Sequence, residues 1–298
     1  DKHDTGIYSW AYLRELGVNA FDTAHVYGGG QAERLLGQWV EARGLREKIV
    51  ILTKGAHHNA DRRRVTPFDI TSDLHDSLAR LRTEYIDLYV LHRDDPDVPV
   101  GPVVEILNEH RTAGRIHPFG GSNWSLKRIQ EANEYAEAHG LTPFAVSSPN
   151  YSLAEQVEEP WPGCSSLSGP QGEKDRSWFA RTRMPLFTWS SLAQGFFSGR
   201  FTRETFESYR ENLPSSCLLA YCHPRNFDRL DRVQILARQK GVTIPQLALA
   251  FIINQPLNLF ALIGVFRPEE CQANIDALNL RLTPEELDWL DLKRDHVG

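Results

Sequence analysis

The sequence predicts an α/β protein that folds as a TIM barrel, the (β/α)8 architecture. Short apolar segments alternate with amphipathic helical stretches along the whole chain. The early segments recur at intervals of about thirty residues, which is the length of a βαβ unit. Single polar residues follow the ends of several of these segments, and functional groups that come from many strand ends to one face are typical of a barrel.

Seven segments have the continuous apolar character of fully buried parallel strands. They are 18–21, 49–53, 86–91, 116–120, 144–147, 186–189 and 260–264. A doubly wound sheet is the rival architecture. The glycine run 28–30 follows an early strand, but it lacks the spacing of a dinucleotide-binding fingerprint, so we expect the barrel.

Helices with a clear apolar stripe separate these strands. Apolar residues recur with helical spacing over 32–40 and again over 70–81. Ser125 precedes a third helix as an N-cap. Near the end of the chain, Thr283 to Glu286 is typical of a capping box with proline at the first helical position.

The first strand of the barrel is not visible in the sequence. Residues 9–16 resemble the helix that should follow strand one, and the chain begins at Asp1 without an initiator Met. We therefore expect one barrel domain over residues 1–298 that is N-terminally incomplete and lacks its first strand. The apolar run within 215–222 is the other segment that could supply an eighth strand.

The composition excludes several classes of function. A formal net charge of -6 gives no basic field for nucleic acid or for an anionic membrane. The longest apolar run, 247–253, is too short to span a bilayer. The cysteines lack zinc-like or redox spacing, which predicts reduced thiols, a cytoplasmic location and no metal site; they are Cys164, Cys217, Cys222 and Cys271.

Three consecutive strands end in residues that can act together. Asp22 ends the first recognisable strand, and Tyr27 follows it in a loop; Lys54 ends the second strand and His92 the third. A buried ammonium needs a partner, and Asp22 on the neighbouring strand is the natural one. A Lys beside a Tyr favours the phenolate and brings its pKa towards the working range, so Tyr27 can act as a general acid or base.

With these residues the chain resembles the aldo-keto reductases. The resemblance rests on four segments in order: 17–24 with Tyr27 and Gly28, the pair Thr53 and Lys54, 91–93, and 121–124. It implies a (β/α)8 barrel that binds NADP or NAD without a Rossmann domain and moves hydride between the cofactor and an aldehyde or ketone. In that reading Tyr27 is the general acid/base, Asp22 and Lys54 tune it, and His92 orients the carbonyl.

The resemblance also implies a cofactor site. Ser122, Asn123 and Ser148 match the residues that hold the nicotinamide carboxamide, although Ser148 stands where a Gln is usual, and Trp189 replaces the Tyr that stacks on the ring. The loop near the pyrophosphate matches Ser190, Leu192, Gln194 and Gly195.

The adenosine end matches Gly264, Arg267, Glu270 and Asn274. A carboxylate at Glu270 repels a 2′-phosphate and can accept a hydrogen bond from a free ribose hydroxyl, so we expect NADH to be used at least comparably with NADPH. Arg267 is the residue that could restore phosphate binding.

Trp124, Tyr151 and Trp161 are the predicted substrate residues, and such a rim suits a small, polar, sugar-like carbonyl or alcohol. Two other functions stay open. One is a regulatory subunit of the same fold that senses the nicotinamide cofactor without catalysis. The other is a hydrolase that uses Asp94 and Asp95, but adjacent carboxylates in one loop are poorly placed to flank a scissile bond. The sequence does not indicate the oligomeric state.

Overall fold

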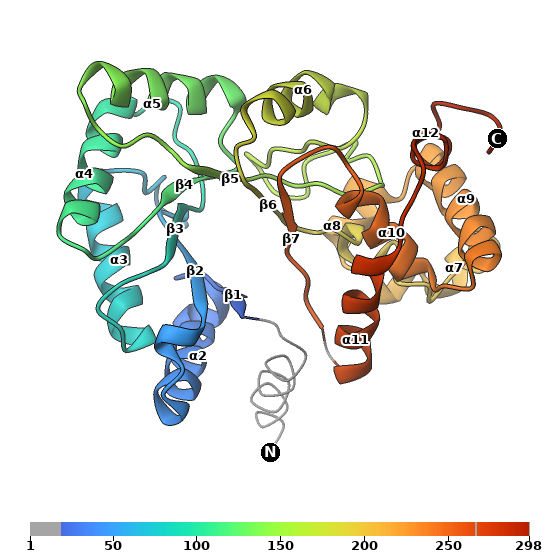
Figure 1. Ribbon diagram of the computed structural model, residues 1–298, viewed down its shortest axis with the longest axis horizontal. Coiled ribbons are helices and arrows are strands. Elements are labelled where there is room, and N and C mark those ends of the chain that lie inside the picture. Colours follow the sequence, from blue (N-terminus) through green and yellow to red (C-terminus); the bar gives the residue numbers. More distant parts are fainter. Residues whose placement is uncertain (1–18, 266, 298) are drawn as a thin grey trace. The chain divides into compact units, whose positions relative to one another are not determined.

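A computed structural model describes residues 19–265 and 267–297 of the chain. The helix expected over 9–16, and any strand before it, lie outside the described residues. The chain divides into two compact units, residues 1–148 and residues 149–298 (Figure 1).

The first unit contains a parallel sheet whose strands follow the order of the chain. Its strands are β1 (Ala20–Asp22), β2 (Val50–Gly55), β3 (Leu88–Leu91), β4 (Phe119–Ser122) and β5 (Val146–Ser148). Each lies within a few residues of a predicted strand. Every residue of β3, β4 and β5 is buried, because this part of the sheet is covered on both faces.

Helices of the first unit alternate with these strands, and Figure 1 shows α3, α4 and α5 along one face of the sheet. They are η1 (Tyr27–Gly30), α2 (Gln31–Arg43), η2 (Arg46–Lys48), α3 (Pro67–Leu81), α4 (Val100–Thr112) and α5 (Leu126–Ala138). The predicted stripe of α3 is buried, with Ile70 and Leu74 both 0% exposed. The Ser125 hydroxyl caps α5 by accepting from the backbone N–H of Arg128, as predicted.

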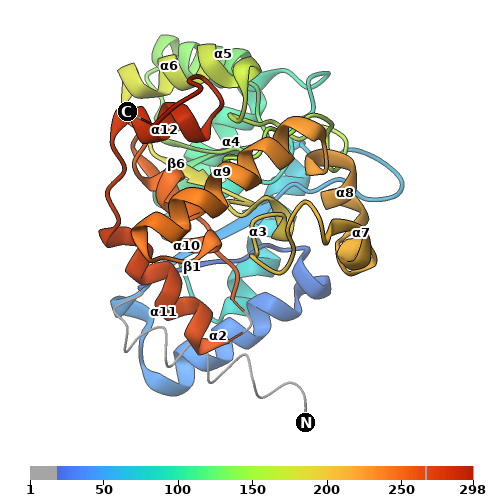
Figure 2. The ribbon, with the colours of Figure 1, turned by 90° about the vertical axis from the view of Figure 1, so that its right-hand side faces the viewer.

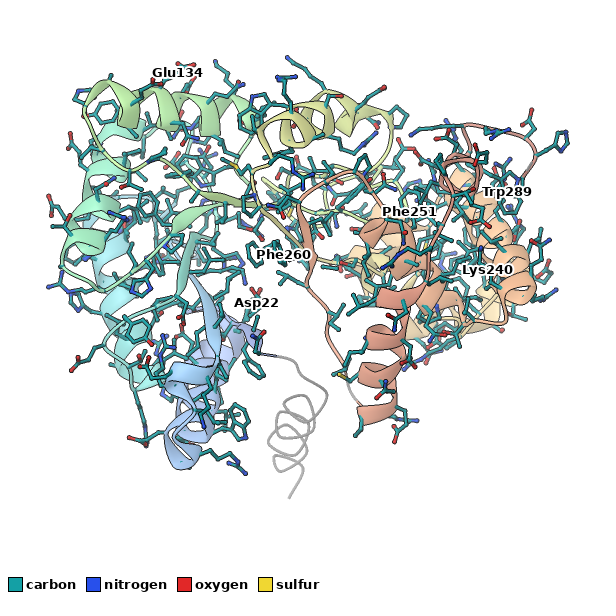
Figure 3. The ribbon with its side chains drawn as sticks, viewed as in Figure 1. Asp22, Glu134, Lys240, Phe251, Phe260 and Trp289 are labelled. Carbon is teal, nitrogen blue, oxygen red and sulfur yellow. The ribbon has the colours of Figure 1, made fainter. Side chains whose placement is uncertain are left out.

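The second unit contains a parallel pair of strands, β6 (Leu186–Thr188) and β7 (Leu259–Ala261), with Leu186 opposite Leu259. The rings of Phe187 and Phe260 stack across the pair with centroids 4.9 Å apart, and Phe260 is labelled on β7 in Figure 3.

Helices make up most of the second unit, where α9 packs against α10 (Figure 2). They are η3 (Pro170–Gly172), α6 (Glu173–Thr182), η4 (Ala193–Gly195), α7 (Phe206–Tyr209), η5 (Arg210–Asn212), α8 (Ser215–Tyr221), α9 (Pro224–Lys240), α10 (Ile244–Ile253), α11 (Pro268–Asp276), η6 (Ala277–Asn279) and α12 (Pro284–Leu290). Since 215–221 is helical, this run does not supply an eighth strand. The capping box predicted at Thr283 is present at the start of α12.

Within the described residues, no helix is long and apolar enough to cross a membrane.

Candidate active site

The loop after β1 carries Tyr27 and is fixed by backbone hydrogen bonds to β2. The N–H of His25 donates to the carbonyl of Lys54 at 2.8 Å. Residues 28–30 then form a tight left-handed turn, with Gly30 at φ 87°. A Cβ at Gly30 would meet the guanidinium carbon of Arg80 at 2.6 Å, and Arg80 in turn donates to the carbonyl of His25 at 3.0 Å. The turn therefore needs glycine and holds Tyr27 beside the end of β2.

Asp22, Lys54 and Tyr27 meet at the carboxyl ends of β1 and β2. Lys54 Nζ donates to Asp22 Oδ1 at 2.5 Å and to the carbonyl of Thr23 at 3.0 Å, and it lies 3.5 Å from the Tyr27 hydroxyl. Lys54 is 2% exposed, whereas Tyr27 is 39% exposed. Figure 3 labels Asp22 at the end of β1. The buried ammonium thus lies between a carboxylate and a phenol that is open to a reactant.

Burial and pairing act in opposite directions on these charges. Burial lowers the pKa of Lys54, but the nearby Asp22 and then Tyr27 outweigh it, so the pKa of Lys54 is raised overall. Burial raises the pKa of Asp22, and Lys54 offsets part of this effect. Lys54 therefore remains a cation at neutral pH.

His92 follows β3 and packs against Tyr27, with ring centroids 5.7 Å apart and nearly perpendicular planes. Burial, then the charge of Lys54, holds the pKa of His92 well below its usual value of 6.5. The imidazole is therefore neutral and can hydrogen-bond a substrate oxygen.

His57 is a residue of this site that the sequence did not reveal. Its ring lies 4.8 Å from that of His92, and burial lowers its pKa. The contact follows from the register of β2 and β3, because Gly55 pairs with Leu91 and both histidines lie just beyond that pair.

The predicted nicotinamide residues of the first unit converge at the ends of β4 and β5. Ser122 Oγ donates to the carbonyl of Ser148 at 2.8 Å, and Asn123 Nδ2 donates to Ser122 Oγ at 3.1 Å. Asn123 has φ 59°, a left-handed conformation that is uncommon outside glycine and concentrates at functional sites. The Ser148 hydroxyl is fully buried and has no hydrogen-bond partner in the described part of the chain.

The predicted cofactor loop of the second unit follows β6 and contains several left-handed residues. Ser190 and Gln194 both have φ 53°, and Gly195 has φ 98°. The indole Nε1 of Trp189 and the Nε2 of Gln194 are buried and lack partners among the described residues. Leu192 lies within this loop as the residue that precedes η4.

The predicted adenosine-end residues lie around the start of α11. Gly264 is exposed, Arg267 precedes the helix, and Asn274 is 6% exposed within it. Arg200 Nη2 lies 3.7 Å from Glu270 Oε1. The sequence did not indicate this arginine, which partly neutralises the Glu270 carboxylate.

The predicted substrate aromatics differ in exposure. Trp124 is 2% exposed, packs on Phe144 and donates its indole N–H to the carbonyl of Arg93, and Tyr151 is 3% exposed. Both rings are therefore buried, and a contact of either with substrate stays a prediction. Trp161 is 46% exposed and lies with its ring 6.2 Å from that of Trp189. It alone of the three offers surface to a substrate.

The described residues contain no cluster of three or more His, Cys, Asp or Glu side chains that could hold a metal ion.

Comparison with known proteins decides the family. The model of the Aldo/keto reductase family matches residues 10–295. The chain belongs to the aldo/keto reductase family. A crystal structure of an aldo-keto reductase from Klebsiella pneumoniae in complex with NADPH has a TM-score of 0.72 and 24% identity, over 99% of this chain and 87% of that one. This likeness confirms the predicted barrel fold.

Two curated relatives illustrate the functional range of similar proteins. Aldo-keto reductase YhdN of Bacillus subtilis is 28% identical over 282 residues, which cover 91% of this chain and 78% of that protein. A putative voltage-gated potassium channel subunit beta of Schizosaccharomyces pombe is also 28% identical, over 296 residues that cover 93% and 80%. Because the chain is equally identical to both relatives, sequence identity does not decide between an enzyme and a channel subunit, and the residues of the site have to be considered.

Proposed function

We propose that this protein is an NAD(P)H-dependent oxidoreductase that reduces an aldehyde or ketone, or oxidises the corresponding alcohol. The observation that carries the proposal is the position of Lys54 between Asp22 and the exposed hydroxyl of Tyr27. A phenol beside a buried ammonium is a proton donor for a carbonyl oxygen that gains negative charge.

Each of the four residues has a role in the proposed reaction. The bound nicotinamide supplies hydride to the carbonyl carbon. Tyr27 donates its proton to the carbonyl oxygen and retains the negative charge, which the Lys54 ammonium stabilises. Asp22 holds Lys54 in place and charged. The neutral imidazole of His92 hydrogen-bonds the carbonyl oxygen and orients it towards Tyr27.

The residues present fit a nicotinamide cofactor. The buried Ser148 hydroxyl without a partner, beside Ser122 and Asn123, supports a carboxamide contact in the first unit. The unpaired indole N–H of Trp189 and the left-handed Ser190 and Gln194 support a ligand at the loop after β6. The NADPH complex of the Klebsiella pneumoniae reductase supports the same class of cofactor. The pairing of Glu270 with Arg200 supports use of both NADH and NADPH.

We also propose that residues 1–298 act as one barrel domain on a small-molecule carbonyl compound in the cytoplasm. Four cysteines without disulfide-like or metal-binding spacing support that location.

A second function is a cofactor-sensing regulatory subunit, which the similarity to the Schizosaccharomyces pombe channel subunit favours. The arrangement of the four residues supports the enzyme instead, because a sensor has no need of a proton donor held by a charged pair.

Turnover separates the two functions. We expect oxidation of NADH or NADPH with a library of aldehydes, ketones and sugar-like carbonyls. Tyr27→Phe should slow the chemical step by about a hundredfold or more while cofactor affinity, measured by fluorescence, is retained. Cofactor binding without turnover of any carbonyl would favour the sensor. Equal loss of binding and turnover in Tyr27→Phe would make Tyr27 structural.

A further inference from the structure

Arg93, directly after His92, is a buried cation that lacks a carboxylate partner. It is 8% exposed, and in the described part of the chain its side chain makes one hydrogen bond, from Nη1 to the carbonyl of His92 at 3.4 Å. The other guanidinium nitrogens of Arg93 have no hydrogen-bond partner in the described residues, but they are not fully buried, so a ligand can reach them. Burying a cation that has only one long hydrogen bond to a neutral oxygen costs folding free energy, and an anion bound beside the cation would offset this cost.

The carboxylates that follow Arg93 in the sequence are bound to other arginines. Arg128 holds Asp94 through two bonds of 3.0 and 3.1 Å. Arg63 holds Asp95 at 2.8 Å. Neither carboxylate forms an ion pair with Arg93 in the described residues, although both lie within two positions of it in the chain.

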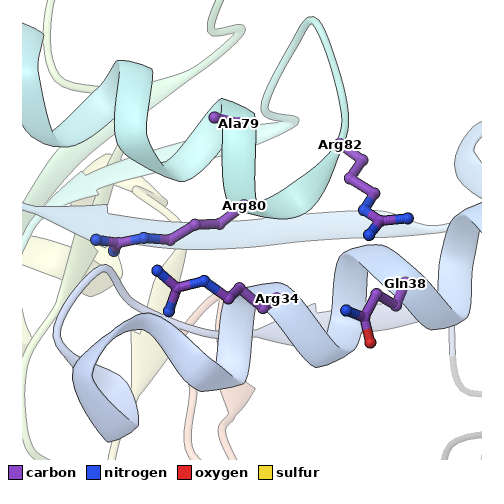
Figure 4. Close-up of a pocket in the computed structure, with 5 residues that line it drawn as sticks. All are labelled: Arg34, Gln38, Ala79, Arg80 and Arg82. Atoms are coloured by element: carbon purple, nitrogen blue, oxygen red, sulfur yellow. The ribbon is translucent and has the colours of Figure 1, made fainter.

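Other arginines of the same unit show the usual arrangement. A pocket of about 300 Å³ between α2 and α3 is lined by Arg34, Gln38, Ala79, Arg80 and Arg82 (Figure 4). Arg80 pairs there with the buried Glu33, and Arg82 pairs with Glu41. Arg34 is exposed. Arg93 has neither a carboxylate nor full hydration.

The surroundings of Arg93 belong to the reaction site. Burial lowers the pKa of the neighbouring imidazoles of His92, His57 and His58, and the charge of Arg93 adds a smaller effect in the same direction. A neutral imidazole has one N–H group, which can donate a hydrogen bond to an anion. The indole N–H of Trp124 fixes the Arg93 backbone by donating to its carbonyl at 3.2 Å.

We propose that Arg93 binds an oxyanion of the substrate, a carboxylate or a phosphate, so that the preferred substrate is an anionic aldehyde or ketone. This inference rests on the proposed reductase function. The guanidinium forms a charge-assisted pair with the anion, and His92 takes the carbonyl oxygen.

Matched substrate pairs test the inference. Wild-type kcat/KM should be higher for succinic semialdehyde than for butanal, or for glyceraldehyde 3-phosphate than for glyceraldehyde, and the pair that responds distinguishes a carboxylate from a phosphate. Arg93→Met should lower kcat/KM for the anionic member about tenfold or more relative to the neutral member, and the difference should lie in KM. Arg93→Lys should retain part of the preference. Arg111→Met, which removes an exposed cation on α4, should retain all of it.

Three results would overturn the inference: equal wild-type rates within both pairs, an equal loss for both members in Arg93→Met, or a loss of cofactor affinity in its place. Calorimetry with succinate and with inorganic phosphate needs no turnover. Binding to wild type that Arg93→Met abolishes would support the oxyanion site even if no carbonyl were reduced. Absence of turnover with every carbonyl would instead remove the reductase function.

Discussion

The two units place their functional groups in different ways. In the first unit Asp22, Lys54 and His92 come from the ends of paired strands, and Lys54 is bonded to Asp22 and Thr23. In the second unit the predicted cofactor residues lie on the loop after β6 and around α11, and the buried nitrogens of Trp189 and Gln194 have no partner in the described residues. Asp22 and Lys54 are already satisfied by one another, whereas the groups proposed to meet the cofactor, Ser148 of the first unit among them, still have capacity to bind.

Backbone conformation shows the same contrast. The strand residues that carry Asp22 and Lys54 are extended, whereas Ser190, Ala193 and Gln194 are all left-handed. Such residues cost about 1 kcal/mol or more each and persist where the surrounding structure requires them. Changes at Asp22 and Lys54 should therefore affect chemistry and stability, and changes in the loop after β6 should affect cofactor affinity.

The largest effect should come from Lys54→Met. It leaves the Asp22 carboxylate, whose side chain is 22% exposed, beside an apolar side chain, so the free energy of unfolding should fall by about 2 kcal/mol. Adding Asp22→Asn should recover part of this loss, because no unpaired charge then remains. Denaturant unfolding of the two single variants and the double variant measures the coupling.

A matched control for this cycle is Lys127→Met. Its side chain is 85% exposed and its ammonium lies 3.6 Å from Glu131, so its removal should have no measurable effect on unfolding. If Lys54→Met were as stable as wild type, the ion pair with Asp22 would not stabilise the ends of β1 and β2, and the stabilising role given to the first unit would be wrong.

A smaller effect is expected in the second unit from Glu270→Arg. The change replaces a carboxylate with a cation that can pair with a 2′-phosphate, so the ratio of Kd values should shift towards NADPH by about tenfold. Glu269→Arg, on the exposed neighbouring residue, is the charge-matched control and should shift it less. Fluorescence titration with both cofactors measures the ratio. An equal change for NADH and NADPH would place Glu270 away from the ribose.

Much of this arrangement could be predicted from the sequence. Each of the seven strands in the described residues overlaps a predicted segment, because these segments are short apolar runs, and a polar residue that ends such a run stands out. This is why Asp22, Lys54 and His92 were recognised. Residues that matter through contacts between loops were missed, as His57 and Arg200 show, because neither local spacing nor composition records which loops meet.

The sequence also did not predict which aromatic residues are exposed. Trp124 and Tyr151 were expected at the mouth but are buried, whereas Trp161 is exposed. An aromatic side chain is equally at home in a core or at a binding surface, so only packing decides between them. For Trp124 the deciding partners are Phe144 and the carbonyl of Arg93, which lie on other segments of the chain.

The smallest predicted effect concerns acid stability, which should come largely from the first unit. Burial, then the charge of Arg115 and of His75, lowers the pKa of His110 from its ordinary 6.5 to about 4. The unfolded chain therefore takes up a proton first, and stability is lost as the pH falls from 6.5 towards 4. At pH 5 the loss should be about 1 kcal/mol after allowing for solvent around the ring. His110→Gln keeps a partner for the Thr71 hydroxyl, which lies 2.9 Å from the ring, and should flatten the slope of unfolding free energy between pH 7 and 5. Urea titrations at several pH values measure this slope. An unchanged slope in the variant would mean that acid sensitivity arises elsewhere, with the buried His92 as the next group to test.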